Sequence, residues 1–228
     1  MLTIASVSAF GQAANIGQFA VWKPKDGQLQ NFENGYRQHL DWHRANGDKW
    51  SWYGWFIASG ARYGQFVDAT FDHSWADFDK AVKPAEDLAD NRLHVFPFGD
   101  VQTVFKVAFL PEYSTADAYA NKLRLVRNIT IRTDDLGNGL KVVEKLRDFY
   151  VSKRIKSFRA YRIVDGGPTD RIMLMLGFAG WEEFGMTESW QEKAAEFERS
   201  LKVKTLRSVD SETLVYRADM SLFPDDGK

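Results

Sequence analysis

Hydrophobic and polar positions change their spacing in a regular order along the chain. Residues 16–23 alternate as in a β-strand, and apolar side chains then recur every three or four positions over residues 29–45, which predicts a helix. Residues 50–59 and 63–73 are rich in aromatic and β-branched side chains. A turn signal at Gly60 separates these two runs, so together they predict a β-hairpin.

The first half closes with a helix predicted over residues 75–89, interrupted near Pro84, and a strand over residues 102–110. The second half repeats the same order. Its predicted elements are a strand at 123–132, a helix at 140–152, a hairpin of 158–164 and 171–179, a helix at 187–201 and a strand at 213–221. Each half therefore follows the order βαββαβ, which is the order of a ferredoxin-like unit.

The two halves also match at the level of single residues when they are offset by 106 positions. Trp75-Ala76-Asp77-Phe78 corresponds to Trp181-Glu182-Glu183-Phe184 at this offset. A period of this length indicates a duplicated domain, because solenoid repeats are much shorter. We expect a first repeat over residues 15–112 and a second repeat over residues 122–224.

One predicted strand of the second half is apolar on both faces. Leu174 and Leu176 share one face of residues 171–179, and Met173 and Met175 share the other. Helices cover only one face of a ferredoxin-like sheet, so the second face needs another partner. The sheet of the other half is the simplest cover. The fold class predicted is therefore α+β, with two tandem ferredoxin-like repeats forming an intramolecular barrel.

This organisation resembles the dimeric α/β-barrel superfamily in a tandem-repeat form. The resemblance spans about residues 16–223 and rests on the repeat and the order of elements. The opening segment, residues 19–27 (FAVWKPKDG), looks most like NIPSNAP-like domains. The superfamily also includes antibiotic-biosynthesis-type monooxygenases, EthD-like proteins and chlorite-dismutase-like haem proteins. No catalytic signature of these families is matched, so no active-site residue is carried over.

Composition narrows the classes of function. Thirty basic residues stand against 31 acidic ones, which gives no electrostatic reason to expect nucleic acid. The chain has no cysteine, so disulfides and thiolate chemistry are excluded. Phosphate-cradling glycine loops and the G-x-S-x-G elbow do not occur, and no apolar run after the start approaches a membrane span. We expect a small-molecule ligand as the partner; a homo-oligomer stays open.

The first residues carry two interpretations. Residues 1–10 are uncharged and apolar, and Gly11-Gln12-Ala13 follows them, as at the end of a secretory signal. No basic residue precedes Lys23, although such signals begin with one. Residues 1–14 are therefore either a signal-peptide remnant, which implies an exported (periplasmic) protein, or an N-terminal arm of a cytoplasmic one.

The halves differ most on the second strand of the hairpin. Where the second half carries apolar side chains at alternating positions, the first half has Asp68, Thr70 and Asp72. Alternating positions face one side of a strand, so we predict a polar pocket floor with Asp68 and Asp72 as catalytic carboxylates and Thr70 as a substrate contact. The alternative is a solvated face, or a pairing of Asp68 with Arg62 or Arg37.

The aromatic hairpin supplies candidate pocket walls. Tyr53, Trp55 and His73 are predicted to bind a flat apolar or aromatic substrate, with His73 on the opposite strand face from Asp68. Gly54 lies among bulky rings and marks a bulge or a close approach of backbone. The alternative is that these rings are ordinary core. The resemblance implies the reaction class, a cofactor-independent oxygenase or isomerase.

All four histidines lie in the first half. His39 and His43 are four residues apart on a predicted helix, so both imidazoles could meet one metal, which makes them weak metal candidates. A third ligand would come from His73, Asp72 or Glu33. The rival interpretation places His43 in the core. A haem or metal protein is thus one alternative function, and a non-catalytic binding or assembly protein is another; the cofactor stays unknown.

Overall fold

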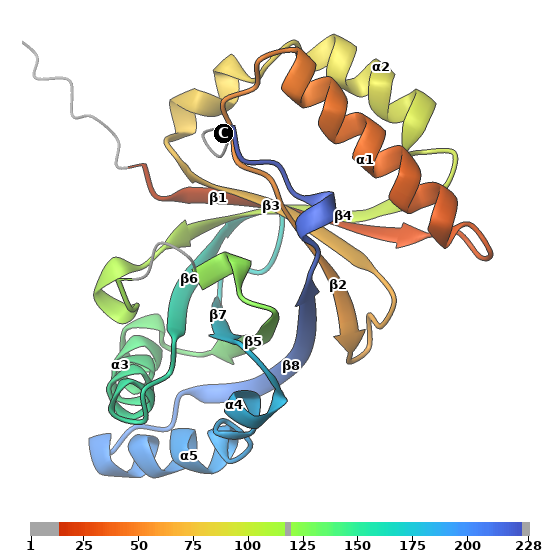
Figure 1. Cartoon of the computed structure of the whole chain (residues 1–228). Helices are drawn as coiled ribbons and strands as arrows, with labels where there is room; N and C mark the ends of the chain where they lie inside the picture. Colours follow the sequence, from red (N-terminus) through yellow and green to blue (C-terminus); the bar gives the residue numbers. More distant parts are fainter. Residues whose placement is uncertain (1–13, 117–119, 225–228) are drawn as a thin grey trace, which may run out of the picture.

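The computed structural model describes residues 14–116 and 120–224. In this part of the chain, eight strands close one antiparallel barrel in the order β1-β3-β2-β8-β5-β7-β6-β4 (Figure 1). Almost all of the predicted signal remnant or arm falls outside the described residues, so both interpretations of it stay predictions. None of the helices in the described ranges has the length and apolar character needed to cross a membrane.

The first repeat supplies four strands and two α-helices. Its elements are β1 (Ile16–Pro24), α1 (Leu29–Ala45), β2 (Tyr53–Ser59), β3 (Phe66–His73), the 3-10 helix η1 (Trp75–Lys80), α2 (Pro84–His94) and β4 (Gly99–Phe109). Two short 3-10 helices, η2 (Pro111–Tyr113) and η3 (Ala120–Lys122), lie between the repeats.

The second repeat follows the same plan. Its elements are β5 (Leu125–Thr133), α3 (Leu136–Ser152), β6 (Ser157–Asp165), β7 (Arg171–Phe178), α4 (Trp181–Gly185), α5 (Trp190–Leu201), β8 (Leu206–Tyr216) and the 3-10 helix η4 (Ala218–Met220). The predicted fold class of two βαββαβ repeats is confirmed. The matching tetrapeptides begin equivalent elements, because η1 follows β3 and α4 follows β7.

The two repeats complete each other's sheets. Each sheet has its fourth strand beside its first, in the orders β4-β1-β3-β2 and β8-β5-β7-β6. β8 then pairs with β2, with Trp55 opposite Tyr216, and β4 pairs with β6, with Phe109 opposite Tyr161. Helices α1 and α2 cover one side of the barrel, and α3, α4 and α5 cover the other (Figure 1).

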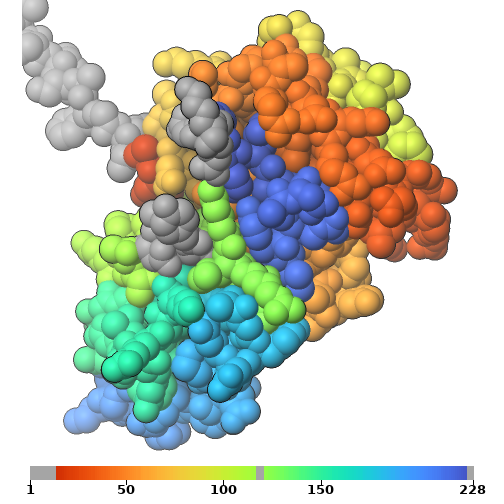
Figure 2. All heavy atoms as spheres, in the orientation of Figure 1, coloured from red at the N-terminus to blue at the C-terminus, as the bar shows by residue number. Residues whose placement is uncertain are grey.

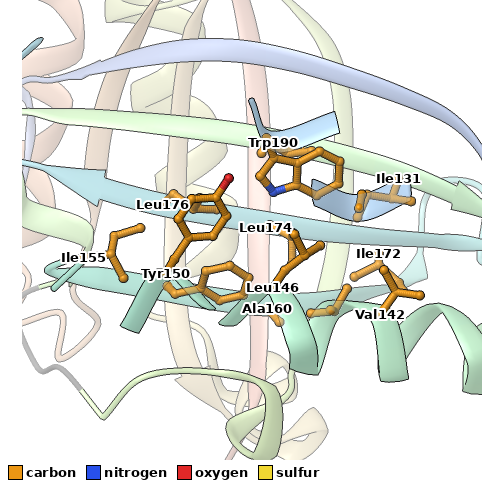
Figure 3. Close-up of a cluster of buried hydrophobic side chains, with 14 of the residues drawn as sticks. Ile131, Val142, Leu146, Tyr150, Ile155, Ala160, Ile172, Leu174, Leu176 and Trp190 are labelled. Carbon is orange, nitrogen blue, oxygen red and sulfur yellow. The ribbon is translucent and has the colours of Figure 1, made fainter. Parts of the chain in front are cut away.

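Within the described part of the chain, apolar side chains pack in three clusters. The barrel interior holds side chains from both repeats, among them Phe19, Trp55, Val67, Tyr161 and Met173. The largest cluster lies between the second sheet and its helices, where Figure 3 shows Leu146, Tyr150, Leu174, Leu176 and Trp190 packed together. A smaller cluster lies between the first sheet and α1, around Trp22, Phe32, Tyr36, Phe66 and Met220.

The boundaries differ from the prediction mainly around Pro84. The expected single helix is a 3-10 helix followed by α2, which begins at Pro84 and extends to His94. Proline is favoured in the first turn of a helix because it has no N–H to leave unsatisfied, so here it begins a helix instead of interrupting one. Ser74 and Asp77 form a capping box that starts η1. Because α2 extends from Pro84 to His94, its residues Asp87 and Asp90 face α1.

The last strand lies earlier than predicted. β8 ends at Tyr216, and the chain then turns along α1, where Arg217 donates to both carboxylate oxygens of Glu33 at 2.7 and 3.0 Å. In Figure 2 this C-terminal segment lies beside α1. Gly54 makes room for it, because a side chain there would overlap the carbonyl oxygen of Met220. The close approach predicted at Gly54 is therefore real, and the chain's own C-terminal segment fills it.

Helices α1 and α2 touch directly. A Cβ atom at Gly35 would overlap the backbone carbonyl of His94, so only glycine permits this separation. The contact sets one face of α1, with His39 and His43, against the face of α2 that carries Asp87 and Asp90. The lack of a side chain at one position thus determines how the polar residues of both helices meet.

Candidate functional site

The space between the first sheet and its helices contains two adjoining cavities. Their volumes are about 300 Å³ and about 150 Å³, and both are lined by Gln18, His43, Trp52 and Asp87. The larger cavity is also lined by Trp50, Phe78 and Lys106, and the smaller by Trp22, Tyr36, His39 and Asp68. Aromatic walls and a few polar groups that point inward are typical of small-molecule sites.

A larger hollow of about 450 Å³ opens at one end of the barrel, beside Arg62, Asn128 and Arg171. Arg62 is already engaged there, because it donates to both carboxylate oxygens of Glu212 at 3.0 and 2.6 Å. No histidine lines this hollow. The groups that can exchange protons at neutral pH converge instead between the first sheet and its helices, so we place the candidate site there.

Asp68 lies on the wall of the smaller cavity and is only 6% exposed. The indole Nε1 of Trp22 donates to its Oδ2 at 2.6 Å, and the Tyr36 hydroxyl also bonds to it. Burial raises the pKa of Asp68 to about 7, against the opposing effect of the Trp22 bond. The predicted pairing with Arg62 or Arg37 is wrong, since those arginines bind Glu212 and Asp219. Asp68 is a carboxyl group that can hold or release a proton near neutrality.

The alternation of β3 breaks at Asp72. This residue is exposed and has a left-handed backbone with φ of 64°. Its charge contributes to raising the pKa values of Tyr53 and Tyr161, whose rings belong to the barrel interior, after burial has had the larger effect. The prediction that Asp72 shares a face with Asp68 is therefore wrong, and Asp72 lines neither cavity.

His73 lies on the face of β3 that carries Thr70, where Asp72 was expected. Its Nε2 lies 2.6 Å from Oγ1 of Thr70, and both side chains are buried. The prediction that His73 faces away from Asp68 fails for the same backbone reason. Its ring packs against Trp50 and Phe78, with centroids 4.2 and 5.5 Å away. Thr70 and His73 thus support two cavity walls from behind and do not line the cavity themselves.

Tyr53 and Trp55 lie on the opposite face of the sheet from Asp68. Both belong to the barrel interior, where their rings stack with centroids 5.8 Å apart. Burial raises the pKa of Tyr53 to about 12, so its hydroxyl stays protonated. The predicted pocket residues therefore divide between two faces. Trp55 is a core residue, as the alternative interpretation held, and Tyr53 is partly buried against the same cluster.

His39 and His43 face each other on one side of α1. Both residues are 5% exposed, and their Nε2 atoms are 3.1 Å apart. Oδ1 of Asp87, from α2, lies 3.3 Å from Nε2 of His39 and 3.4 Å from Nε2 of His43. Of the residues that the structure describes, these three form a group able to hold one metal ion. The third ligand expected from sequence, His73, Asp72 or Glu33, is replaced by Asp87.

Two further carboxylates hold the outer nitrogens of these rings. Nδ1 of His39 lies 2.7 Å from Oδ2 of Asp90. Nδ1 of His43 lies 2.8 Å from Oδ2 of Asp48, off the direction of a straight hydrogen bond. Burial lowers the pKa of His39, but the bonds to Asp87 and Asp90 outweigh burial and leave that pKa raised. The imidazoles are thus tied to helix α2 and to the loop after α1.

Comparison with known proteins identifies the fold. No protein-family model matches the chain, and no curated protein does. A candidate monooxygenase from Lactobacillus acidophilus NCFM has a similar structure, with a TM-score of 0.63 and 12% identity over 92% of this chain and 97% of its own. A mutant chlorite dismutase from Candidatus Nitrospira defluvii, solved in complex with cyanide, matches with a TM-score of 0.58 and 9% identity over 92% of this chain and 93% of its own. The chain has the dimeric α/β-barrel fold.

A third dimeric α/β-barrel structure, an anthrone oxidase-like protein, matches with a TM-score of 0.52 and 6% identity over 90% of this chain and 92% of its own. None of these three is a NIPSNAP-like protein, so that part of the resemblance stays a prediction. At such low identities the likeness concerns the path of the backbone, and the chemistry must come from this chain's own side chains.

His39, His43 and His73 of this dimeric α/β barrel do not fit a haem. An axial histidine must present a ring nitrogen to a space wide enough for the macrocycle. Nε2 of His39 and of His43 face each other and Asp87, while Nε2 of His73 is bonded to Thr70. The haem alternative therefore has no support from these three histidines.

Sequence reasoning missed the residues that complete the site. Asp87, Asp90 and Asn91 lie on one face of α2, a pattern that becomes visible only once the helix is known to begin at Pro84. Asp48 follows the turn that ends α1, where it also accepts the indole N–H of Trp52 at 2.9 Å. The spacing from Asp87 to Asp90 was the available signal.

Proposed function

We propose that the protein binds a small, flat, largely apolar organic molecule between the first sheet and helices α1 and α2. The observation that carries this proposal is the contrast between equivalent spaces in the two repeats. Asp68 borders a cavity, whereas its counterpart Leu174 is fully buried among apolar side chains (Figure 3). A chain that fills one such space and leaves the other hollow and polar has the arrangement of a binding site.

The walls indicate the chemistry of the ligand. Trp50, Trp52 and Phe78 offer aromatic surface on which a planar ring can pack. Lys106 lines the same cavity, and its ammonium group is 3.3 Å from Asp165. An ammonium group has three N–H donors, so Lys106 could also bind an acidic group of a ligand. A phenol or a hydroxylated polycyclic ring matches both features.

Asp68 would act as the acid–base group. A carboxyl group works best in proton transfer when its pKa lies near the working pH, and burial places that of Asp68 at about 7. Trp22 and Tyr36 would stabilise the charged carboxylate before the reaction. The carboxylate would then remove a proton from a phenol or an activated C–H group of the ligand, which leaves Asp68 neutral and the negative charge on the ligand. Such a step begins an isomerisation or a cofactor-independent oxygenation, the reaction classes that we propose.

The test is ligand binding followed by turnover. We would titrate the chain with a panel of phenols and hydroxylated polycyclic compounds and follow the intrinsic tryptophan fluorescence, to which Trp50 and Trp52 contribute from the cavity wall. Asp68→Asn should leave binding within about threefold but abolish turnover, because the amide cannot accept the proton. Trp52→Leu should weaken binding at least tenfold.

Asp72→Asn is the matched control. It also removes one carboxylate from β3, four residues after Asp68, at a position that lines neither cavity. It should behave like the unmodified chain. The proposal is wrong if no compound binds, or if Trp52→Leu binds as tightly as the unmodified chain. Turnover that survives Asp68→Asn would remove the acid–base role and leave a binding protein.

A further inference from the structure

We propose that His39, His43 and Asp87 bind one divalent first-row transition-metal ion, of which Zn²⁺ is the simplest case. This inference goes beyond the proposed function, because it concerns the metal alone and holds whether or not the neighbouring cavity binds an organic molecule. It rests on four features of the cluster: its triangle of donor atoms, its outer carboxylates, its charge and its access.

The three donor atoms form a nearly equilateral triangle. Its sides are 3.1 Å between the two Nε2 atoms and 3.3 and 3.4 Å from these atoms to Oδ1 of Asp87. Ligands placed about 2.0–2.1 Å from a tetrahedral Zn²⁺ lie about 3.3–3.4 Å from each other. One ion bound to all three atoms would therefore leave the distances between them almost unchanged. Two helices already hold the triangle in place, since Gly35 permits their close contact.

A carboxylate lies beside the outer nitrogen of each imidazole. A ligating histidine commonly donates the N–H of its other ring nitrogen to a carboxylate, which leaves the lone pair aimed at the metal. Asp90 lies at that place for His39, at 2.7 Å, and Asp48 lies 2.8 Å from Nδ1 of His43, although off the direction of a straight hydrogen bond. With the protons on both Nδ1 atoms, the two Nε2 lone pairs point at each other and at a carboxylate. That arrangement is repulsive unless a proton or a cation lies between them.

Charge favours a cation at this point. Three carboxylates surround two imidazoles, and within the described ranges none of the three is paired with a lysine or an arginine. Asp48 and Asp90 are largely buried, and buried carboxylates are costly unless they are compensated. A divalent ion compensates two of the three charges, as two protonated imidazoles would.

The cluster is accessible from one side. The side chain of Asp87 is 33% exposed, and both cavities reach the triangle. The amide of Asn91 lies at the rim, with Nδ2 2.9 Å from Nε2 of His39, while its buried Oδ1 has no partner. Turning this amide about its last bond would present the oxygen to the ion. Any further ligand would be water or a molecule in the cavity.

The donor set selects the class of metal. Two imidazole nitrogens and one carboxylate oxygen suit Zn²⁺, Fe²⁺ and Co²⁺, whereas Mg²⁺ prefers oxygen ligands alone. The hydrogen-bonded alternative, in which His39 carries a proton and binds Asp87 and Asp90 without a metal, uses the same side chains. Experiment separates the two, because only the metal site shows stoichiometric binding with this selectivity.

The first experiment is calorimetric titration of the chelator-treated full chain with Zn²⁺, Co²⁺ and Mg²⁺. We expect one Zn²⁺ per chain with micromolar or tighter affinity, visible absorption bands for Co²⁺, and no binding of Mg²⁺ under the same conditions. His43→Gln and Asp87→Asn should weaken Zn²⁺ binding at least about 100-fold, and Asp48→Asn and Asp90→Asn about 10- to 100-fold. Asp41→Asn, on the exposed side of α1, is the matched control and should bind as before.

A second measurement does not depend on whether the variants fold. In the unmodified chain, Zn²⁺ should shift the nitrogen resonances of the His39 and His43 Nε2 atoms and leave those of His73 unchanged. Absence of stoichiometric Zn²⁺ and Co²⁺ binding would overturn the proposal in favour of the hydrogen-bonded alternative. Equal binding of Mg²⁺, or undiminished Zn²⁺ affinity in folded Asp87→Asn, would overturn it as well.

Discussion

Trp22 holds the carboxyl group of Asp68 from the neighbouring strand, with Nε1 2.6 Å from Oδ2. The pair is buried beneath α1, in the position that Leu174 occupies in the second repeat. An indole N–H is a neutral donor, so it stabilises the carboxylate without adding a compensating charge. The bond therefore offsets only part of the effect of burial, which leaves Asp68 with a raised pKa, and the raised pKa has a measurable consequence for stability.

We predict that Asp68→Asn removes a decline in stability that extends from about pH 4 to about pH 7. The pKa of Asp68 is about 7 in the folded chain against an ordinary value of 3.8. Between these values the folded state keeps a proton that the unfolded state has lost, so the contribution is full at low pH and is lost as pH rises through about 7. Urea unfolding of both chains from about pH 5 to about pH 8 measures the difference.

The groups facing Asp68 are Tyr36 and His39 from α1 and Asp87 from α2. His39 also has a raised pKa, so it changes stability in the same direction as Asp68. Comparison with Asp68→Asn at each pH, in the presence of chelator, removes most of that shared contribution. A free-energy difference between the two chains that stays constant over this range would contradict the prediction.

Gly35→Ala should push α1 and α2 apart. The added methyl group would overlap the carbonyl of His94, and overpacking of this kind costs about 1–3 kcal/mol. We expect a melting temperature lower by several degrees and weaker Zn²⁺ binding, because Asp87 would move away from the imidazoles. Gly180→Ala is the control, since no atom lies within 4 Å of a Cβ at that position.

Arg217→Met should destabilise the chain at neutral pH by about 1 kcal/mol, because Arg217 bonds to Glu33 and Asp219. The bond to Arg217 lowers the pKa of Asp219 from 3.8 to about 2. The contribution of Asp219 is thus present above the ordinary pKa and is lost as pH falls toward about 2. The gap between variant and unmodified chain should narrow in acid.

Acid unfolding curves monitored by circular dichroism check this prediction for Arg217. Arg207→Met is a suitable comparison, because Arg207 pairs with Asp134 at the surface only. Its effect should be small at every pH. A gap for Arg217→Met that does not change between about pH 5 and about pH 2 would show that the pair carries no pH-dependent stability.

Leu174→Ala should cost about 3 kcal/mol, because it opens a void in the fully buried second-repeat cluster. The same variant should keep its affinity for Zn²⁺ and for a cavity ligand, since both candidate sites lie in the first repeat. Chemical unfolding and calorimetry on one preparation measure the two effects. A parallel loss of Zn²⁺ affinity would mean that the sites depend on global stability.

Spacing along the chain was enough to predict the architecture. Strand and helix periods gave the two βαββαβ units, and the two apolar faces of residues 171–179 required a second sheet as cover. Element boundaries were less accurate at Pro84 and at β8. The first half of β8, Leu206–Asp210, is polar and partly exposed, so it lacks the apolar alternation that marks a half-buried strand.

The candidate site was predictable only in part. His39 and His43 follow from helical spacing, and Asp68 follows from comparison with Leu174. Asp87 does not, because its contact with α1 depends on how two helices dock. The left-handed backbone at Asp72 interrupts the alternation of side chains along β3. Asp72 and His73 therefore lie on the opposite faces from those that alternation predicts. In a barrel both faces of a strand are buried, and sequence pattern alone cannot assign Trp55 to one of them.

The mutual pairing of β2 with β8 and of β4 with β6 has an evolutionary consequence. In a barrel made of two identical subunits, each substitution occurs twice, so an acidic side chain beneath one helix layer weakens both layers at once. A single gene encoding both units removes this symmetry. One layer can then remain an apolar support while the other accumulates polar residues, and selection can act on each separately.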